Sequence, residues 1–160
     1  MIKQYNYGLI IGKFMPLHSG HLSLIEYGLQ YCERIKILLV ISKNEPIEPE
    51  LRYSWLIEHY KNNREIDIDI TNRDAINELP QENRTEAWCK FIKQEYPCID
   101  CIVSSETYGD TLANFLNVDH LKFDHKREMT PISASEIRKD IDKHIHYLPE
   151  HVKKSLTDRK

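Results

Sequence analysis

Two histidines lie near the start of the chain, in a segment whose residue types suit the binding of phosphate. The segment from Gly12 to His21 reads Gly-Lys-Phe-Met-Pro-Leu-His-Ser-Gly-His, which matches the pattern G-x-F-x-P-x-H-x-G-H. Glycines let a backbone approach a ligand, the N–H groups at a helix start favour an anion, and imidazoles there can donate hydrogen bonds or positive charge. A second interpretation, in which Phe14 and His21 are core residues beside an ordinary turn, stays open. The candidate site residues of the segment are Gly12, Lys13, Phe14, His18, Gly20 and His21.

A second group of polar residues lies near the end of the chain. The segment from Ile132 to Arg138 reads Ile-Ser-Ala-Ser-Glu-Ile-Arg, and Arg127 precedes it. Ser135 and Arg138 are three residues apart, so they share one face of a helix and can grip the same polyphosphate. Ser133 can also be the N-cap of that helix, with the glutamate three residues later completing a capping box. Capping and phosphate contact are compatible, so both stay open for Ser133.

Short apolar runs alternate along the chain with segments of helical periodicity. The apolar runs predict strands near residues 7–11, 35–41, 66–70, 101–104 and 121–123. Helical spacing predicts helices near 20–32, 51–63, 85–97 and 107–116. We expect a loop over 74–83, and a C-terminal helix at about 133–160 that closes the site. The alternation predicts a single α/β domain over residues 1–160, with a mostly parallel sheet and helices on both faces. Ligands of such sheets lie beyond the carboxyl ends of the strands, which places the site after the first strand.

The composition is that of an ordinary globular domain. Of the 160 residues, 41% are hydrophobic and 29% are charged, and the formal net charge is −3. Without a long basic run, this charge predicts neither a nucleic-acid partner nor an anionic membrane surface as partner. No apolar stretch approaches the roughly 20 residues that span a bilayer, and no export signal is evident, so we expect a cytoplasmic protein. The sequence leaves a homo-oligomer open, and its four scattered cysteines predict reduced thiols.

At these two segments the sequence resembles the nucleotidyltransferase superfamily that carries an HxGH and an ISxTxxR signature. The signatures stand here as His18-Ser19-Gly20-His21 and Ile132-Ser133-Ala134-Ser135-Glu136-Ile137-Arg138, where Ser135 replaces the usual threonine, hydroxyl for hydroxyl. Within the superfamily the chain resembles nicotinamide-nucleotide adenylyltransferases, especially the adenylyltransferase domain of bifunctional bacterial NAD-regulator proteins. Four features carry this second resemblance: Gly12-Lys13-Phe14, Arg52 with Trp55, the segment from Ser104 to Gly109, and Asp124 with Arg127.

The resemblance implies a Rossmann-like fold and the transfer of AMP from ATP to nicotinamide mononucleotide, giving NAD and pyrophosphate. It implies that His18 and His21 bind the ATP phosphates and that Lys13 and Arg138 act with them in catalysis. The further ATP-binding residues that it implies are Gly12, Phe14, Gly20, Arg127, Ser133 and Ser135. The implied acceptor-binding residues are Arg52 and Trp88, with a buried core tryptophan as an equal alternative for Trp88. Because the acceptor's phosphate is itself nucleophilic, the implied chemistry needs positioning and charge stabilisation, with Mg²⁺ as the cofactor.

Other functions fit parts of the pattern. A related transferase would use phosphopantetheine or a polyol phosphate as acceptor, or CTP as donor, although cytidylyltransferases usually carry Asp where this chain has Met15. A nucleotide-sensing module without turnover would keep the same binding residues. The kinase domain of the bifunctional proteins would need a G-x-x-x-x-G-K-[ST] loop, which the sequence does not contain. Cys98-Ile99-Asp100-Cys101 is a single CxxC pair without the further ligands of a structural zinc site, so ordinary thiols are expected.

Overall fold

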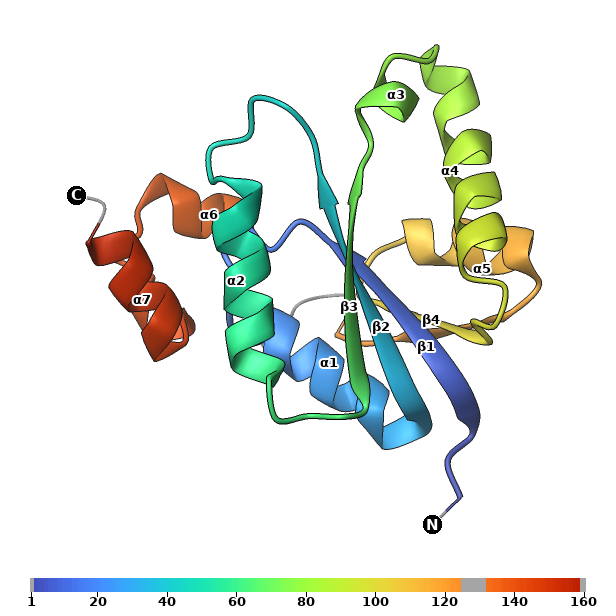
Figure 1. The fold of residues 1–160 in the computed structure, drawn as a ribbon, viewed down its shortest axis with the longest axis horizontal. Coiled ribbons are helices and arrows are strands. Elements are labelled where there is room, and N and C mark those ends of the chain that lie inside the picture. Colours follow the sequence, from blue (N-terminus) through green and yellow to red (C-terminus); the bar gives the residue numbers. More distant parts are fainter. Residues whose placement is uncertain (1, 125–131, 159–160) are drawn as a thin grey trace.

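The centre of the molecule is a sheet of parallel strands (Figure 1). In this computed structural model, which describes residues 2–124 and 132–158, each described strand pairing is parallel and the strand order is β3-β2-β1-β4-β5. The strands are β1 (Tyr5–Gly12), β2 (Cys32–Ile41), β3 (Ile66–Asn72), β4 (Cys101–Ser104) and β5 (Asp119–Lys122). The strand order reverses between β1 and β4, so the loops after these two strands frame the crevice in which such sheets bind ligands.

Helices cover both faces of the sheet (Figure 1). One face carries α1 (Ser19–Tyr31), α2 (Pro49–Tyr60), α6 (Ala134–Lys139) and α7 (Glu150–Thr157), which all contribute buried residues to one core cluster. The other face carries α4 (Gln81–Glu95), preceded by the short α3 (Asp74–Asn77), and α5 (Tyr108–Leu116). The predicted α/β fold with helices on both faces of a parallel sheet is therefore confirmed. Within the described ranges, none of the helices has the length and apolar character to cross a membrane.

Neighbouring residues of each strand pack into opposite cores, because side chains alternate along a strand. Leu9 and Leu38 pack on the face of α4 and α5, whereas Ile10 and Ile37 pack on the face of α1 and α2. All four side chains are fully buried, and each such burial stabilises the fold by roughly 1.5–3 kcal/mol. The central strands are covered on both sides, which explains why they read as continuous apolar runs in the sequence.

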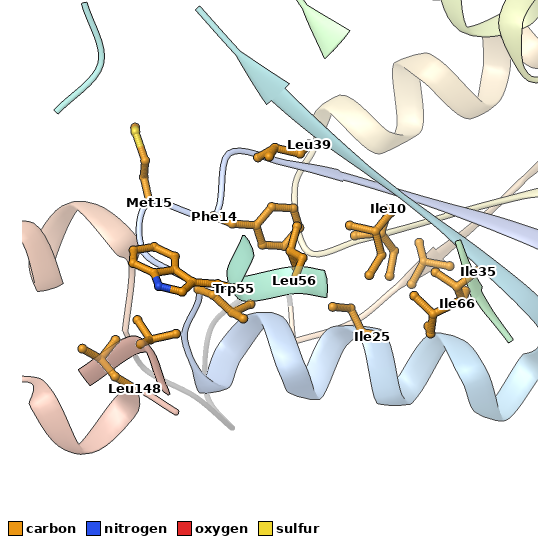
Figure 2. Packing of buried hydrophobic residues seen from close by; sticks show 14 of the residues in the cluster. Ile10, Phe14, Met15, Ile25, Ile35, Leu39, Trp55, Leu56, Ile66 and Leu148 are labelled. Atoms are coloured by element: carbon orange, nitrogen blue, oxygen red, sulfur yellow. The ribbon is translucent and has the colours of Figure 1, made fainter. Parts of the chain in front are cut away.

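The loop after β1 is anchored in the core. Phe14 and Met15 are buried and belong to the same core cluster as Trp55 of α2 and Leu148, which precedes α7. In Figure 2, Phe14 lies above α1, and Trp55 lies between Met15 and Leu148. Because buried side chains hold this loop, its polar residues are presented in fixed positions.

The structure differs from the predicted elements in two places. The predicted loop over residues 74–83 contains α3 and the first turn of α4, whose first residue follows Pro80. Proline suits the start of a helix, because the N–H that it lacks would have no helical partner there. The predicted C-terminal helix at 133–160 is wrong, since α6 and α7 are separated by a 3₁₀ turn at Ile145–Tyr147. Leu148 is extended, with ψ of 139°, because the residue before a proline disfavours helical conformation.

Candidate active site

A cavity of about 480 Å³ opens where the loop after β1 meets the starts of α1 and α6. We call it the histidine cavity. It is lined by Ile11, Gly12, Lys13, Phe14, Met15, His18, Gly20, His21, Leu24, Ser104, Ser105, Glu106, Tyr108, Phe123, Asp124, Ser133, Ala134, Ser135 and Arg138. The fold thus joins the two segments that the sequence singles out, although they lie at opposite ends of the chain. Of the predicted ATP-binding residues, Arg127 lies outside the described residues, and the others border this cavity.

His18 and His21 form a pair at the start of α1, with their ring centroids 3.8 Å apart. Nδ1 of His18 accepts a hydrogen bond from the N–H of Gly20 at 3.0 Å, and Nδ1 of His21 accepts one from the N–H of His18 at 3.1 Å. A ring nitrogen that accepts carries no proton, so each neutral ring keeps its proton on Nε2. The two histidines therefore cap α1 through Nδ1 and can donate through Nε2–H to a ligand in the cavity that they line.

Phe14 supports this histidine pair. Its ring is 2% exposed, its centroid lies 4.7 Å from that of His21, and its backbone has the left-handed φ of 51°. A Cβ on Gly12 would stand only 3.1 Å from the Phe14 ring, so the glycine provides the space that this ring needs. Although Phe14 borders the cavity, its burial fits the core interpretation better than the predicted contact with ATP.

The second predicted segment lines the same cavity through α6. Arg138 donates from Nη1 to the carbonyl of Met15 at 2.6 Å and from Nη2 to the hydroxyl of Ser135 at 3.3 Å. The hydroxyl of Ser133 accepts a hydrogen bond from the N–H of Glu136 at 3.2 Å, so Ser133 is the N-cap of α6. Ser133 and Ser135 both line the cavity, which keeps phosphate contact open beside the observed capping. Arg138 thereby ties α6 to the loop after β1.

A second cavity, of about 430 Å³, shares a wall with the first. The shared wall consists of Ile11, Gly12, Lys13 and Tyr108. We call this second space the aromatic cavity, and the rest of its lining is Val40, Arg73, Arg84, Thr85, Trp88, Cys89, Thr111 and Leu112. Trp88 is half-buried: it packs against the core between α4 and the sheet, and it also lines the cavity. The position of Trp88 is thus compatible with both interpretations, a core tryptophan and an acceptor-binding residue.

Lys13 and Arg52 meet on one buried carboxylate, that of Glu45. Glu45 pairs with Nζ of Lys13 at 3.0 Å and with Nη2 of Arg52 at 2.8 Å. Burial opposes the ionisation of Glu45, but hydrogen bonds from the N–H of Ser42 and from the two cations outweigh it, so the pKa of Glu45 lies below its ordinary value. Arg52 is fully buried, donates to the carbonyl of Lys13 at 3.1 Å, and is absent from the described walls of both cavities. In the structure Arg52 positions the loop that carries Lys13, and its predicted contact with the acceptor stays a prediction.

A hydrogen-bonded chain of Ser104, His120 and Asp110 stands behind the histidine cavity. The hydroxyl of Ser104 lies 2.7 Å from Nε2 of His120, and Nδ1 of His120 lies 2.9 Å from Asp110. Gly109 leaves room for this chain, because a Cβ there would stand 2.3 Å from Nε2 of His120. The three partners come from β4, β5 and α5, so no local sequence pattern could reveal them. Their bonds fix the cavity wall that Ser104 contributes.

Two kinds of curated protein are similar to this chain, although no family model matches it. It is 25% identical over 164 residues to the trifunctional NAD biosynthesis/regulator protein NadR of Escherichia coli (strain K12), covering 91% of this chain and 39% of that protein. It is 26% identical over 115 residues to the probable nicotinate-nucleotide adenylyltransferase of Christiangramia forsetii, covering 68% of this chain and 56% of that protein. The chain spans about two-fifths of the length of the NadR proteins that it matches.

Solved structures of related proteins have the same fold. A NadR protein in complex with NAD and AMP-PNP matches with a TM-score of 0.67 at 19% identity, over 91% of this chain and 46% of that chain. A bifunctional NMN adenylyltransferase/ADP ribose pyrophosphatase from Francisella tularensis, complexed with AMP and a manganese ion, matches with a TM-score of 0.62 at 21% identity, over 84% and 41%. These likenesses confirm the predicted Rossmann-like nucleotidyltransferase fold and the predicted resemblance of the chain to NAD-regulator proteins and nicotinamide-nucleotide adenylyltransferases.

Proposed function

We propose that this chain is a nucleotidyltransferase that moves the adenylyl group of ATP onto nicotinamide mononucleotide, giving NAD and pyrophosphate. The observation that carries the proposal is the pair of cavities with a shared wall at the end of β1. One cavity offers hydrogen-bond donors and a cation for a triphosphate, and the other offers an indole for a flat ring. The similarity to NadR and to a nucleotide adenylyltransferase supports the same activity. The proposed partners are ATP and the mononucleotide, without nucleic acid or membrane, and the proposed compartment is the cytoplasm.

The proposed reaction takes place where the two substrates meet at the shared wall. An oxygen of the acceptor's phosphate attacks the α-phosphorus of ATP, and a new phosphorus–oxygen bond forms. The bond from the α-phosphorus to the bridging oxygen breaks, and its electron pair leaves with pyrophosphate. Because the attacking oxygen is already ionised at neutral pH, catalysis reduces to in-line positioning and charge stabilisation.

The chain's own residues supply that positioning and stabilisation in the proposed mechanism. His18 and His21 donate from Nε2–H to the phosphate oxygens on which charge builds up. Arg138 and the hydroxyls of α6 hold the β and γ phosphates. Lys13 belongs to the shared wall, so its ammonium group serves the phosphates of both substrates. Its ion pair with Glu45 holds that ammonium group near the wall until substrates arrive.

Mg²⁺ fits this site as an ion that arrives with the nucleotide. Magnesium usually binds substrate phosphates and one or two carboxylates and keeps several waters. Glu106 and Asp124 are carboxylates that line the histidine cavity, and they would hold such an ion. Among the described residues, no three or more His, Cys, Asp or Glu side chains lie together so that they could hold a metal ion. A site that the protein alone forms would require such a group. When bound, the ion neutralises negative charge on the phosphate oxygens.

A panel of acceptors tests the proposed function. The chain is incubated with ATP, Mg²⁺ and one acceptor at a time, and the products are identified by mass spectrometry. Nicotinamide mononucleotide should give NAD and an equal amount of pyrophosphate, whereas phosphopantetheine and glycerol phosphate should give neither. Product from one of those acceptors alone would indicate another transferase of the same fold. Nucleotide binding without release of pyrophosphate would indicate a sensing module.

A further inference from the structure

Tyr108 lines both cavities, and the proposed mechanism gives it no role. It is the first residue of α5, and it is 39% exposed. The rest of the described shared wall, Ile11, Gly12 and Lys13, belongs to the end of β1 and to the loop that follows it. Tyr108 therefore approaches the shared wall from the other side of the crevice.

A hydrogen bond holds the Tyr108 ring across this crevice. Its hydroxyl donates to the carbonyl of Ile11 at 3.0 Å. The described pairing of β1 with β4 ends at Leu9, opposite Ile102, so Ile11 lies beyond the paired part of the two strands. Because the Tyr108 backbone lies on α5 and its hydroxyl bonds β1, its ring spans the gap where the strand order reverses. The ring thus stands between the two cavities, where the two proposed substrates have to meet.

The β1 side of the shared wall offers a passage between the cavities. Gly12 contributes no side chain to it, and the half-exposed Lys13 is paired with Glu45 at 3.0 Å. The acceptor's phosphate therefore reaches the α-phosphorus of ATP beside Gly12, and the ring of Tyr108 bounds the passage from the α5 side. A fixed boundary limits the directions from which a nucleophile can approach, and this transfer needs an in-line approach.

Two nucleophiles compete for the α-phosphorus of bound ATP. Attack by the acceptor's phosphate gives the dinucleotide and pyrophosphate. In the competing reaction, the oxygen of a water molecule bonds to the α-phosphorus and the bond to the bridging oxygen breaks. This reaction gives AMP and pyrophosphate, and both protons of the water are released to the solvent. A boundary that keeps water out of the line of attack favours transfer over hydrolysis.

We propose that Tyr108 is the positioning residue that decides between transfer and hydrolysis. Its ring, tethered to the carbonyl of Ile11, holds the acceptor's phosphate in the line of attack and keeps water out of it. This inference rests on the proposed function, because it assigns the two substrates to the two cavities.

The rates of the two reactions test the role of the ring. ATP labelled at the α-phosphorus is incubated with Mg²⁺ and saturating nicotinamide mononucleotide, and the label is measured in NAD and in AMP. The wild type should place nearly all of the label in NAD. Tyr108→Ala should lower the rate of NAD formation about tenfold and raise the rate of AMP release about tenfold, with a nearly unchanged KM for ATP. General damage to the site would lower both rates instead.

Two further variants separate the ring from its tether and from other changes in α5. Tyr108→Phe keeps the ring but lacks the hydroxyl that bonds Ile11, so both rates should lie between those of the wild type and Tyr108→Ala. Phe115→Ala is the matched control, because Phe115 lies on the same helix, is 40% exposed and is absent from the described walls of both cavities. It should leave both rates nearly unchanged. Circular dichroism of each variant verifies that it is folded.

The outcomes separate this inference from the proposed function. If the wild type forms NAD, a parallel fall of both rates in Tyr108→Ala, or no change in either, would overturn the inference alone. An equal effect of Phe115→Ala would overturn it too. If the wild type forms no NAD, the proposed function fails, and the release of AMP from ATP alone still decides the inference. Faster release by Tyr108→Ala than by the wild type supports it, whereas equal or slower release overturns it.

Discussion

His18 and His21 each have two tasks that belong to different ring nitrogens. Nδ1 of each ring caps α1, and Nε2–H is the donor assigned to the phosphates. Asparagine is a good N-cap whose side-chain oxygen can replace Nδ1, but it has no group in place of Nε2. His18→Asn should therefore keep the thermal stability within a few degrees of wild type while turnover falls at least about 100-fold, as expected for a lost charge-stabilising donor. The melting temperature and kcat are the two measurements.

His21→Ala should show a similar loss of turnover, and His146→Ala is the control for both changes. His146 is exposed, its ring is tilted against that of Tyr147 with the centroids 4.1 Å apart, and it is not part of the described wall of the histidine cavity. Near-wild-type turnover in both His18→Asn and His21→Ala would remove the histidine pair from the assigned site.

Arg138 is the residue whose role depends most on the length of the phosphate chain. It is assigned to the β and γ phosphates, so Arg138→Ala should weaken the binding of ATP much more than that of AMP. Arg138→Lys should restore only part of the affinity, because a point charge does not replace the guanidinium fork that also bonds Met15 and Ser135. Calorimetry with both nucleotides measures the difference, with the exposed neighbour Lys139→Ala as the control. Equal losses for ATP and AMP would place Arg138 away from the polyphosphate.

Among the elements, the loop after β1 depends on the buried pair of Glu45 and Arg52. Without the carboxylate, the fully buried guanidinium of Arg52 would lack its counter-charge, which typically costs about 3–5 kcal/mol. Glu45→Gln should therefore lower the free energy of unfolding by about 3 kcal/mol, measured by urea denaturation at pH 7. Glu33→Gln, at an exposed glutamate, should change it by less than about 0.5 kcal/mol. Equal effects of the two substitutions would show that the pair does not hold the loop.

The pH dependence of stability should report the same pair. The pKa of Glu45 in the folded protein is below its ordinary value of 4.5, so the unfolded chain binds this proton more tightly than the folded protein does. Its contribution to stability is therefore complete above pH 4.5 and is lost as the pH falls through the lowered pKa. The difference in unfolding free energy between the wild type and Glu45→Gln should accordingly shrink as the pH falls through that range.

The contact between α5 and β5 depends on the missing side chain of Gly109. A Cβ at this position would lie 2.3 Å from Nε2 of His120 and 2.4 Å from the hydroxyl of Ser104. Gly109→Ala should therefore destabilise the fold by about 1–3 kcal/mol, as overpacking usually does. In a His120→Ala background the same substitution should cost less, because only the Ser104 hydroxyl then crowds the added Cβ, and a double-mutant cycle of unfolding free energies measures the difference. Additive effects of the two substitutions would contradict the crowding.

For the molecule as a whole, the sequence predicted those features that depend on local pattern. The apolar run at residues 101–104 matches β4, and the predicted helix at 20–32 differs from α1 by one residue at each end. Both elements could be predicted because burial leaves a pattern in the sequence. A strand buried on two faces is a continuous apolar run, and a helix buried on one side has apolar residues at helical spacing. The two site segments, which the fold brings to one cavity, could also be recognised in the sequence. Their residue types and spacing are those that a helix start needs to bind phosphate.

Features that depend on the approach of distant elements were not readable. Arg52 has the residue type of a phosphate-binding side chain, yet a carboxylate seven residues before it holds it in the core. The Ser104 and His120 pair joins two strands that share no sequence pattern. The C-terminal segment was predicted as one helix because its apolar spacing continues through the turn before α7. In each case a tertiary contact or a single proline determines the structure, and neither produces a repeating pattern of residues in the sequence.

The most direct test of the central claim follows the α-phosphate of ATP through the reaction. ATP labelled at the α-phosphorus is incubated with the wild-type chain, Mg²⁺ and nicotinamide mononucleotide, and a parallel reaction uses ATP labelled at the γ-phosphorus. Adenylyl transfer predicts that the α label appears in NAD and the γ label in pyrophosphate, in equal amounts and at a rate that His18→Asn lowers at least about 100-fold. Release of the α label as free AMP, or transfer of the γ label to the acceptor, would contradict the account.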